Sequence, residues 1–158
     1  MPDNLTVDQR RRCMQAIRSR HTQPEIIARC FLHRLGFRFR LHVAQLPGRP
    51  DIVLPRFKTV IFVHGCFWHS HRCSRAVVPK TRQNYWVPKL NNTRQRDIRH
   101  KRLLKKYGWE VITVWECEVQ NSRMLTKRLQ SLIRSRRRIS RRRPRSQRVS
   151  NRARQFRQ

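Results

Sequence analysis

His64-Gly65-Cys66-Phe67-Trp68-His69-Ser70-His71-Arg72-Cys73 combines two cysteines, three histidines and two large aromatic side chains within ten residues. Thiolate and imidazole groups are common zinc ligands in proteins. Imidazole is also the side chain best suited to act as a base near neutral pH, and the flat faces of Phe and Trp can stack on nucleobases. The stretch therefore predicts a metal-stabilised loop in a protein that contacts nucleic acid.

The whole chain is a polycation, which favours nucleic acid as its partner. Its formal net charge is +31, of which residues 1–118 carry +16 and residues 119–158, which contain no acidic residue, carry +15. Lys and Arg in such numbers bind phosphates through counterion release, without sequence selectivity. A basic amphipathic helix with a broad apolar face, as membrane-surface proteins have, does not stand out. Charge alone does not distinguish a DNA enzyme from an RNA-coating protein of the ribosomal type.

Cysteine usage and hydropathy predict a cytoplasmic protein with no membrane partner. The chain has five cysteines, and an odd number argues against a full disulfide framework. The sequence shows no apolar signal segment and no apolar run of the length that a transmembrane helix needs. We therefore expect reduced thiols.

Periodic patterns predict an α/β fold in which helices flank a mixed β-sheet. Apolar runs and strict alternation are typical of strands, whereas apolar residues at helical spacing between capping signals are typical of amphipathic helices. The resulting order, with a hairpin and a helical crossover, predicts a mixed sheet. The expected strands are residues 37–43, 51–54, 59–63 and 109–115, the expected helices are 22–35, 91–107 and 125–133, and residues 74–90 are expected to be irregular.

Composition divides the chain into three parts. Residues 1–21 are polar and Arg-rich and are expected to form an arm that orders on a partner. Residues 22–133 contain the periodic segments and are expected to form one domain. Residues 134–158 are mostly Arg, Ser and Gln, so they cannot bury enough apolar surface to fold alone and predict a disordered tail. We expect the protein to be a monomer.

The cysteines and histidines suggest a structural zinc site. Cys66, His71 and Cys73 follow a C-x4-H-x-C spacing, and Cys117 lies just after the expected strand 109–115, where it could supply a fourth ligand. Four such ligands close a tetrahedral site and leave no position for a reacting water. The other interpretation is a pair of buried free cysteines beside surface histidines.

Asp51 is a candidate ligand for a catalytic magnesium ion. It opens a strand after a tight Pro-Gly-Arg-Pro turn, and a carboxylate at a strand end can hold Mg²⁺ for phosphodiester hydrolysis. His64 and His69 would lie near it, because the strands that carry Asp51 and His64 would be neighbours. The alternatives are that Asp51 only bonds backbone amides, and that the histidines are spare metal ligands or solvent-facing groups.

Two further carboxylates have structural alternatives. Glu25 completes a capping box with Thr22 at the start of the first helix. Asp97 could form an ion pair with Lys101, one helical turn further on.

These motifs together resemble the very-short-patch repair endonucleases, the Vsr-type mismatch nickases. The resemblance covers about residues 10–120. It is carried by Leu46-Pro47-Gly48-Arg49-Pro50-Asp51, by the run Val60 to His69, and by Tyr85-Trp86, Lys89, Arg96-Asp97, Gly108-Trp109 and Trp115-Glu116-Cys117-Glu118.

The resemblance implies a fold of the restriction-endonuclease superfamily and a bacterial, nucleoid-associated enzyme. Such enzymes nick one strand of double-stranded DNA 5′ of the T in a T·G mispair, which starts short-patch repair. It also implies Mg²⁺ as the catalytic cofactor, Zn²⁺ as a structural one, and repair-pathway proteins as further partners.

The resemblance also implies a role for each candidate residue. Asp51 and the backbone carbonyl of Val63 would hold Mg²⁺, His69 would be the general base with Asp97 orienting it, His64 would assist at the phosphate, and Glu25 would touch the water shell of the metal. Zinc would be held by Cys66, His71, Cys73 and Cys117. DNA contacts would come from Phe67, Trp68 and Trp86 as a major-groove wedge, from Met14 and Ile17 on the minor-groove side, and from Lys89.

The chain departs from the family pattern at Val63, where relatives can have a hydroxyl residue, and at Thr93, where Asn is common. Thr93 lies where base contacts are expected, so the sequence context of the mispair stays open. Two alternatives remain: a related DNA nuclease of other specificity, and a non-catalytic, zinc-stabilised nucleic-acid-binding protein.

Overall fold

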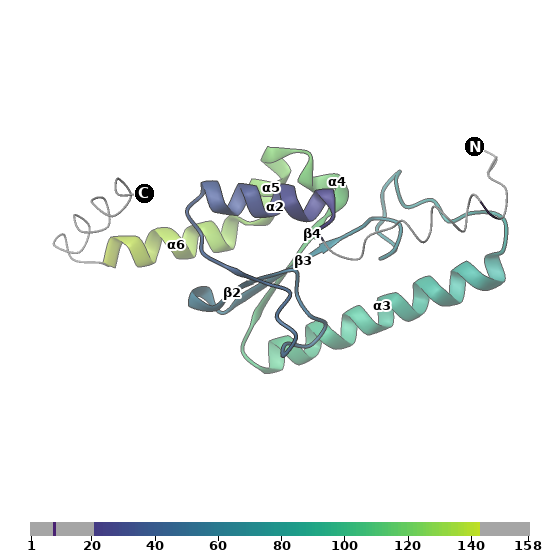
Figure 1. Ribbon diagram of the computed structural model, residues 1–158, viewed down its shortest axis with the longest axis horizontal. Helices are drawn as coiled ribbons and strands as arrows, with labels where there is room; N and C mark the ends of the chain where they lie inside the picture. Colours follow the sequence, from purple (N-terminus) through teal and green to yellow (C-terminus); the bar gives the residue numbers. More distant parts are fainter. Residues whose placement is uncertain (1–7, 9–20, 143–158) are drawn as a thin grey trace.

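The computed structural model describes Asp8 and residues 21–142, which form a four-stranded mixed sheet between two layers of helices (Figure 1). Neighbouring strands β1–β2 and β2–β3 are antiparallel, whereas β3 and β4 are parallel. The strands lie in the order β1 (Arg40–Leu41), β2 (Ile52–Leu54), β3 (Thr59–His64) and β4 (Glu110–Trp115). The expected helix-flanked mixed sheet is therefore confirmed.

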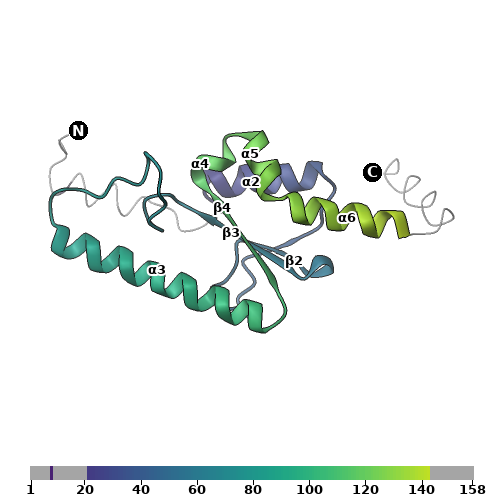
Figure 2. The same ribbon diagram turned by 180° about the vertical axis from the view of Figure 1, so that it is seen from behind.

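Helix α3 (Gln83–Lys106) lies on one side of the sheet and the remaining helices lie on the other, as the two opposite views show (Figures 1 and 2). These are α2 (Gln23–Arg34), α4 (Glu116–Val119), α5 (Ser122–Arg128) and α6 (Gln130–Arg142), with a single 3₁₀ turn, η1 (Pro55–Phe57), after β2. Among the described residues, no helix is both long and apolar enough to cross a membrane.

Two layers of helices explain the unbroken apolar run Val60–Val63 within β3. Ile61 packs into the larger core, with residues of α2, α5 and α6, while Val60 and Phe62 face the smaller core beneath α3. Successive side chains of a strand point to opposite faces, so an unbroken apolar run is stable only where both faces are covered.

The parallel pairing of β3 and β4 brings distant parts of the chain together. In its register His64 pairs with Trp115, so both strands end at the same edge of the sheet. The segment that begins at Gly65 therefore leaves the sheet beside α4, which begins at Glu116.

Two expected boundaries are wrong. The strand expected at 37–43 pairs with β2 only at Arg40–Leu41, because the chain turns into the left-handed region at His42, with φ 46°. Helix α3 begins at Gln83, within the segment expected to be irregular, and contains Pro88. Pro88 is the sixth residue of this helix, where a proline gives up the bond to the carbonyl of Asn84 and crowds that carbonyl, yet the helix runs through it.

The C-terminal region also differs from the expectation. Residues 116–142 form three helices instead of one helix over 125–133, and α6 continues to Arg142, past the point where a disordered tail was expected to begin. Leu129 and Leu132 are fully buried, and the Arg136 guanidinium lies over the Phe37 ring at 5.4 Å. Arg also has a high helix propensity, so the helix persists where apolar residues are few. Residues 143–158 of the expected tail lie outside the described residues.

Leu104 and Leu103 offer a matched test of the smaller core, because Leu104 is fully buried and Leu103 is 36% exposed on the same helix. Leu104→Ala is expected to lower the free energy of unfolding by about 2–5 kcal/mol, through lost burial and a residual cavity. Leu103→Ala is expected to change it by less than about 1 kcal/mol. Urea unfolding measures both values, and equal losses would show that α3 does not pack as described.

Candidate active site and metal-ligand cluster

A cleft of about 740 Å³ lies where α2, the start of β2, the end of β3 and α3 meet. All five candidate catalytic residues line it, namely Glu25, Asp51, His64, His69 and Asp97. Asp51 and His69, on whose proximity the prediction of a hydrolase depends, thus face one cleft. Trp68 and Lys101, the alternative partner of Asp97, also line it.

Asp51 is placed by the turn before β2 and by β3. Gly48 in that turn has φ 74°, and a Cβ there would lie 2.7 Å from His100 Nδ1, so the turn requires glycine. The Val63 N–H donates to Asp51 Oδ2 at 2.7 Å, so Asp51 does make the backbone bond of the structural alternative. Burial raises the pKa of Asp51 to about 6; Glu25 adds to the rise, and the Val63 bond opposes it.

Glu25 is both a helix cap and a member of the cleft. It is almost fully buried and accepts a hydrogen bond from the Thr22 backbone N–H at 3.4 Å, which confirms the capping box. Its Oε2 also lies 2.5 Å from Arg29 Nη2 and 3.5 Å from His42 Nε2.

His42 is a residue of the cleft region that the sequence pattern does not reveal. Donor atoms of Glu25, His42 and Asp51 all lie within 4.8 Å of one another, as in a metal-binding group. In the alternating pattern over 37–43, His42 occupies a polar position of a half-buried strand, so the pattern gives it no further role. Its place directly before the turn that leads to Asp51 was the available signal.

His69 and Asp97 form a tight pair. His69 Nδ1 lies 2.5 Å from Asp97 Oδ2, and both side chains are largely buried. Although burial raises the pKa of Asp97, the hydrogen bond and charge of His69 outweigh it and the net pKa is lowered. Asp97 is thus paired with His69, and the structure shows no ion pair between the described side chains of Asp97 and Lys101.

His64 stacks on His69 with ring centroids 3.7 Å apart and planes at 9°. It is nearly fully buried, and burial lowers its pKa to about 3, with the neighbouring His69 acting in the same direction. His64 is therefore neutral at physiological pH. Its Nδ1 is buried and has no hydrogen-bond partner among the described residues.

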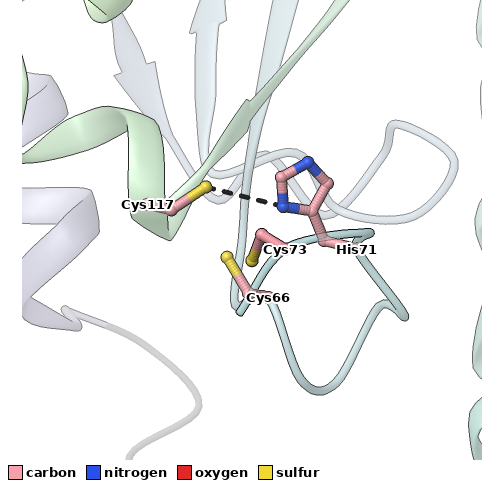
Figure 3. A group of neighbouring side chains, drawn as sticks. All are labelled: Cys66, His71, Cys73 and Cys117. Carbon is pink, nitrogen blue, oxygen red and sulfur yellow. Dashed lines mark hydrogen bonds between the residues drawn. The ribbon is translucent and has the colours of Figure 1, made fainter. Parts of the chain in front are cut away.

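Cys66, His71, Cys73 and Cys117 converge at the end of the sheet, as the sequence analysis expected (Figure 3). Their donor atoms all lie within 4.8 Å of one another, and Cys117 Sγ is 3.5 Å from His71 Nδ1. Backbone bonds within the loop fold it back on itself, with the His71 N–H donating to the Cys66 carbonyl at 2.9 Å. The His71 ring stacks on Trp115 at 4.2 Å, which fixes its orientation.

Burial raises the pKa of the Cys66 thiol to about 12. One buried thiol, two partly buried thiols and an imidazole form the soft donor set that zinc prefers. The four residues therefore could hold a metal ion in a closed site.

Phe67, Trp68 and Trp86 form one aromatic cluster between the loop and the start of α3. The Phe67 ring lies 5.0 Å from that of Trp68 and 5.3 Å from that of Trp86. Lys89 Nζ lies 4.9 Å from the Tyr85 ring and donates to the Tyr85 hydroxyl at 2.6 Å. The early start of α3 places Tyr85, Trp86 and Lys89 on one helix. Met14 and Ile17, the expected minor-groove contacts, lie outside the described residues.

Comparisons with known proteins agree with this geometry. The family described as DNA mismatch endonuclease Vsr matches residues 2–75. The Vsr DNA mismatch endonuclease of Escherichia coli is 42% identical over 113 residues, which are 72% of each chain. The chain belongs to the Vsr family.

Other relatives in the comparisons are nicking enzymes. The type II nicking enzyme V.XorIIP of Xanthomonas oryzae is 47% identical over 133 residues, which are 84% of this chain and 98% of the relative. V.NmeAIP of Neisseria meningitidis is 42% identical over 134 residues, which are 85% of this chain and 96% of the relative. Membership of the Vsr family makes this protein a DNA endonuclease, and its partner is DNA.

The raised pKa of Asp51 predicts that its ionised carboxylate destabilises the folded protein at neutral pH. Its folded-state pKa of about 6 exceeds the ordinary 3.8, so the stabilisation it contributes at low pH is lost as the pH rises from 3.8 through about 6. Asp51→Asn keeps an acceptor for the Val63 N–H and removes the buried charge. At pH 7.5 it is expected to raise the free energy of unfolding by about 1–3 kcal/mol.

Urea unfolding in Mg²⁺-free buffer measures this gain at pH 7.5 and at pH 4.5, where it should shrink. A variant no more stable than the wild type at pH 7.5 would show that the carboxylate is not held at an electrostatic cost.

Proposed function

We propose that this enzyme is a Mg²⁺-dependent nickase that cuts one strand 5′ of the T in a T·G mispair and so starts very short patch repair. The observation that carries the proposal is the convergence of Asp51 and the His69–Asp97 pair on one cleft. A carboxylate that holds a hard cation, beside a base oriented by a second carboxylate, is an arrangement suited to phosphodiester hydrolysis.

Asp51 and the Val63 carbonyl are proposed to hold the metal, and Glu25 to touch its water shell. These groups offer oxygen donors, which Mg²⁺ prefers. Burial and the neighbouring Glu25 raise the pKa of Asp51, and a bound cation would lower it. When bound, Mg²⁺ would polarise the phosphodiester and stabilise the charge that develops on it.

His69 is proposed as the general base. A carboxylate can only accept a hydrogen bond, so the contact between Asp97 Oδ2 and His69 Nδ1 places the proton of a neutral imidazole on Nδ1. Nε2 then carries the lone pair that can take a proton from the attacking water, and Asp97 stabilises the imidazolium that results. Neutral His64, stacked on His69, adds no positive charge that would oppose this protonation. We propose that His64 assists at the phosphate.

Cys66, His71, Cys73 and Cys117 are proposed to bind a structural zinc ion. The loop that they close carries Phe67 and Trp68, so the metal would hold the aromatic side chains that meet DNA. A loop with few apolar residues of its own gains its folding energy from such an ion.

The aromatic cluster is proposed to recognise the mispair by wedging Phe67, Trp68 and Trp86 into the base stack from the major groove. Unstacking costs a few kcal/mol at a matched step, and less at a wobble pair, so selectivity arises from deformability. Lys89 is proposed to contact a base or phosphate, and Met14 and Ile17 to approach from the minor groove. Thr93 donates its hydroxyl to the Lys89 carbonyl at 3.1 Å, so its base contacts would differ from those of an Asn.

The chain is proposed to have three parts. We propose a restriction-endonuclease-like domain over residues 22–133, an N-terminal DNA-binding arm over residues 1–21, and a C-terminal basic region from residue 134 that grips DNA without sequence selectivity. The protein is proposed to act as a monomer on the bacterial nucleoid in the cytoplasm.

A panel of labelled duplexes tests the reaction: each of the possible mispairs in several sequence contexts, with a matched duplex, with and without Mg²⁺. We expect Mg²⁺-dependent nicking of the T-containing strand of T·G duplexes. Loss of the general base in His69→Ala should lower the nicking rate about 10²- to 10⁴-fold, while the exposed His33→Ala on α2 should leave it unchanged.

The outcomes of the panel separate the alternatives. Strand-specific nicking of other mispairs would favour a nuclease of different specificity. Tight, salt-sensitive binding without scission would favour a non-catalytic binding protein.

Metal analysis tests the zinc site. The purified wild type is expected to contain about one zinc per chain, and Cys117→Ser, which removes one of four ligands, to contain far less. Cys30→Ser is the control, because Cys30 is an exposed cysteine on α2 outside the cluster. Chelation of the wild type should change its tryptophan fluorescence, since Trp115 stacks on His71. A wild type that contains well under one zinc per chain would contradict the proposal.

A further inference from the structure

His42 lies beside Asp51, although none of the chemistry proposed above uses it. It follows β1 with φ 46°, in the left-handed region that non-glycine residues rarely adopt. Its side chain is 12% exposed. Such a conformation persists where the surrounding structure over-determines it, and it is often found at functional sites.

Arg29 determines which nitrogen of His42 carries the proton. Arg29 Nη2 lies 2.9 Å from His42 Nε2 and 2.5 Å from Glu25 Oε2. A guanidinium group can only donate hydrogen bonds, so His42 Nε2 must accept one. The imidazole is therefore neutral, with its hydrogen on Nδ1.

The protonated nitrogen of His42 faces Asp51. His42 Nδ1 lies 3.9 Å from Asp51 Oδ1, while Asp51 Oδ2 accepts the Val63 N–H at 2.7 Å. The two carboxylate oxygens thus have different neighbours: a backbone donor holds one, and the imidazole donor faces the other.

We propose that His42 is a positioning residue for the metal carboxylate: Arg29 sets its tautomer, and its Nδ1–H restrains Asp51 Oδ1. This inference rests on the proposed role of Asp51 in metal binding. At 3.9 Å the two atoms are too far apart for a hydrogen bond, so the restraint is the attraction between the N–H dipole and the carboxylate charge. A carboxylate oriented in this way loses less freedom when it binds an ion. Direct coordination by His42 would instead require Nδ1 to lose its proton, and with it the tautomer that Arg29 selects.

Two substitutions at His42 separate the effect of the Nδ1–H donor from the effect of the left-handed backbone conformation. Asn and Gly both tolerate the left-handed conformation, but only Asn offers an N–H near the position of Nδ1. In the full-length, zinc-containing protein, Mn²⁺ titration followed by electron paramagnetic resonance is expected to show a dissociation constant raised about 10- to 100-fold in His42→Gly. His42→Asn should stay within about threefold of the wild type. Melting temperatures without Mn²⁺ verify that both variants fold.

Several results would overturn the inference. One is wild-type Mn²⁺ affinity in His42→Gly; another is equal weakening in both variants, which would show that the donor is irrelevant. A directly bound nitrogen in the pulsed spectrum of wild-type Mn²⁺, absent from His42→Asn, would make His42 a ligand instead. Asp51→Asn is the reference: if it binds Mn²⁺ as tightly as the wild type, the metal role of Asp51 fails, and this inference fails with it. If Asp51→Asn loses binding but His42→Gly does not, only the role of His42 fails.

Discussion

β3 and β4 run parallel and end together, with His64 paired to Trp115, and this pairing organises both clusters of the molecule. On one side of that edge it leaves His64 and His69 beside Asp97 of α3. On the other it brings Cys117 to the loop that contains Cys66, His71 and Cys73. Parallel strands require a long crossover, and here the crossover is α3, which carries Asp97 and the aromatic residues Tyr85 and Trp86. Helix α3, the connection that parallel strands require, thus also carries residues of the cleft and of the aromatic cluster.

Burial in the cleft makes the charged forms of Asp51 and His64 unfavourable, which lowers the stability of the fold but suits the binding of a charged ligand. Two carboxylates, Glu25 and Asp51, are crowded together, and burial makes ionisation of Asp51 costly. His64 is kept neutral by its burial and has an unpartnered Nδ1 among the described residues. Perturbed groups of this kind gather where a charged ligand is expected to restore the balance. Burying charged groups in the cleft lowers the free energy of unfolding. The apolar residues packed on both faces of β3 offset that loss.

Elements with strong local signals were predictable. The capping box and Gly36 bracket α2, and the unbroken apolar run identifies β3 as a central strand. The four residues of the cysteine–histidine cluster were predictable from spacing and the position of one strand end, because Cys117 joins the cluster only if β4 returns beside β3. The family motifs supplied the other site residues, whose individual chemistry left structural alternatives open.

Features that depend on tertiary contacts were not predictable. Alternation over 37–43 describes where side chains point, but not that the backbone leaves the sheet at His42. Pro88 suggested an irregular segment, although α3 runs through it, with the neighbouring Trp86 packed on Phe67. The local sequence places Arg136 in a polar tail, whereas in the structure its guanidinium packs over the ring of Phe37. In each case the decisive partner lies far away along the chain, beyond the reach of local patterns.

The length of helix α3 has a geometric consequence for the proposed function. Trp86 and Asp97 are eleven residues apart on this one helix, a rise of about 16 Å. Farther along, Leu104 anchors the same helix in the smaller core. In the proposed function, this helix would join the residues that contact the bases to the partner of the general base, so its length would set how far along the strand the cut falls from the mispair. Lengthening or shortening the helix would then move the cut, or prevent it, while leaving every functional group intact.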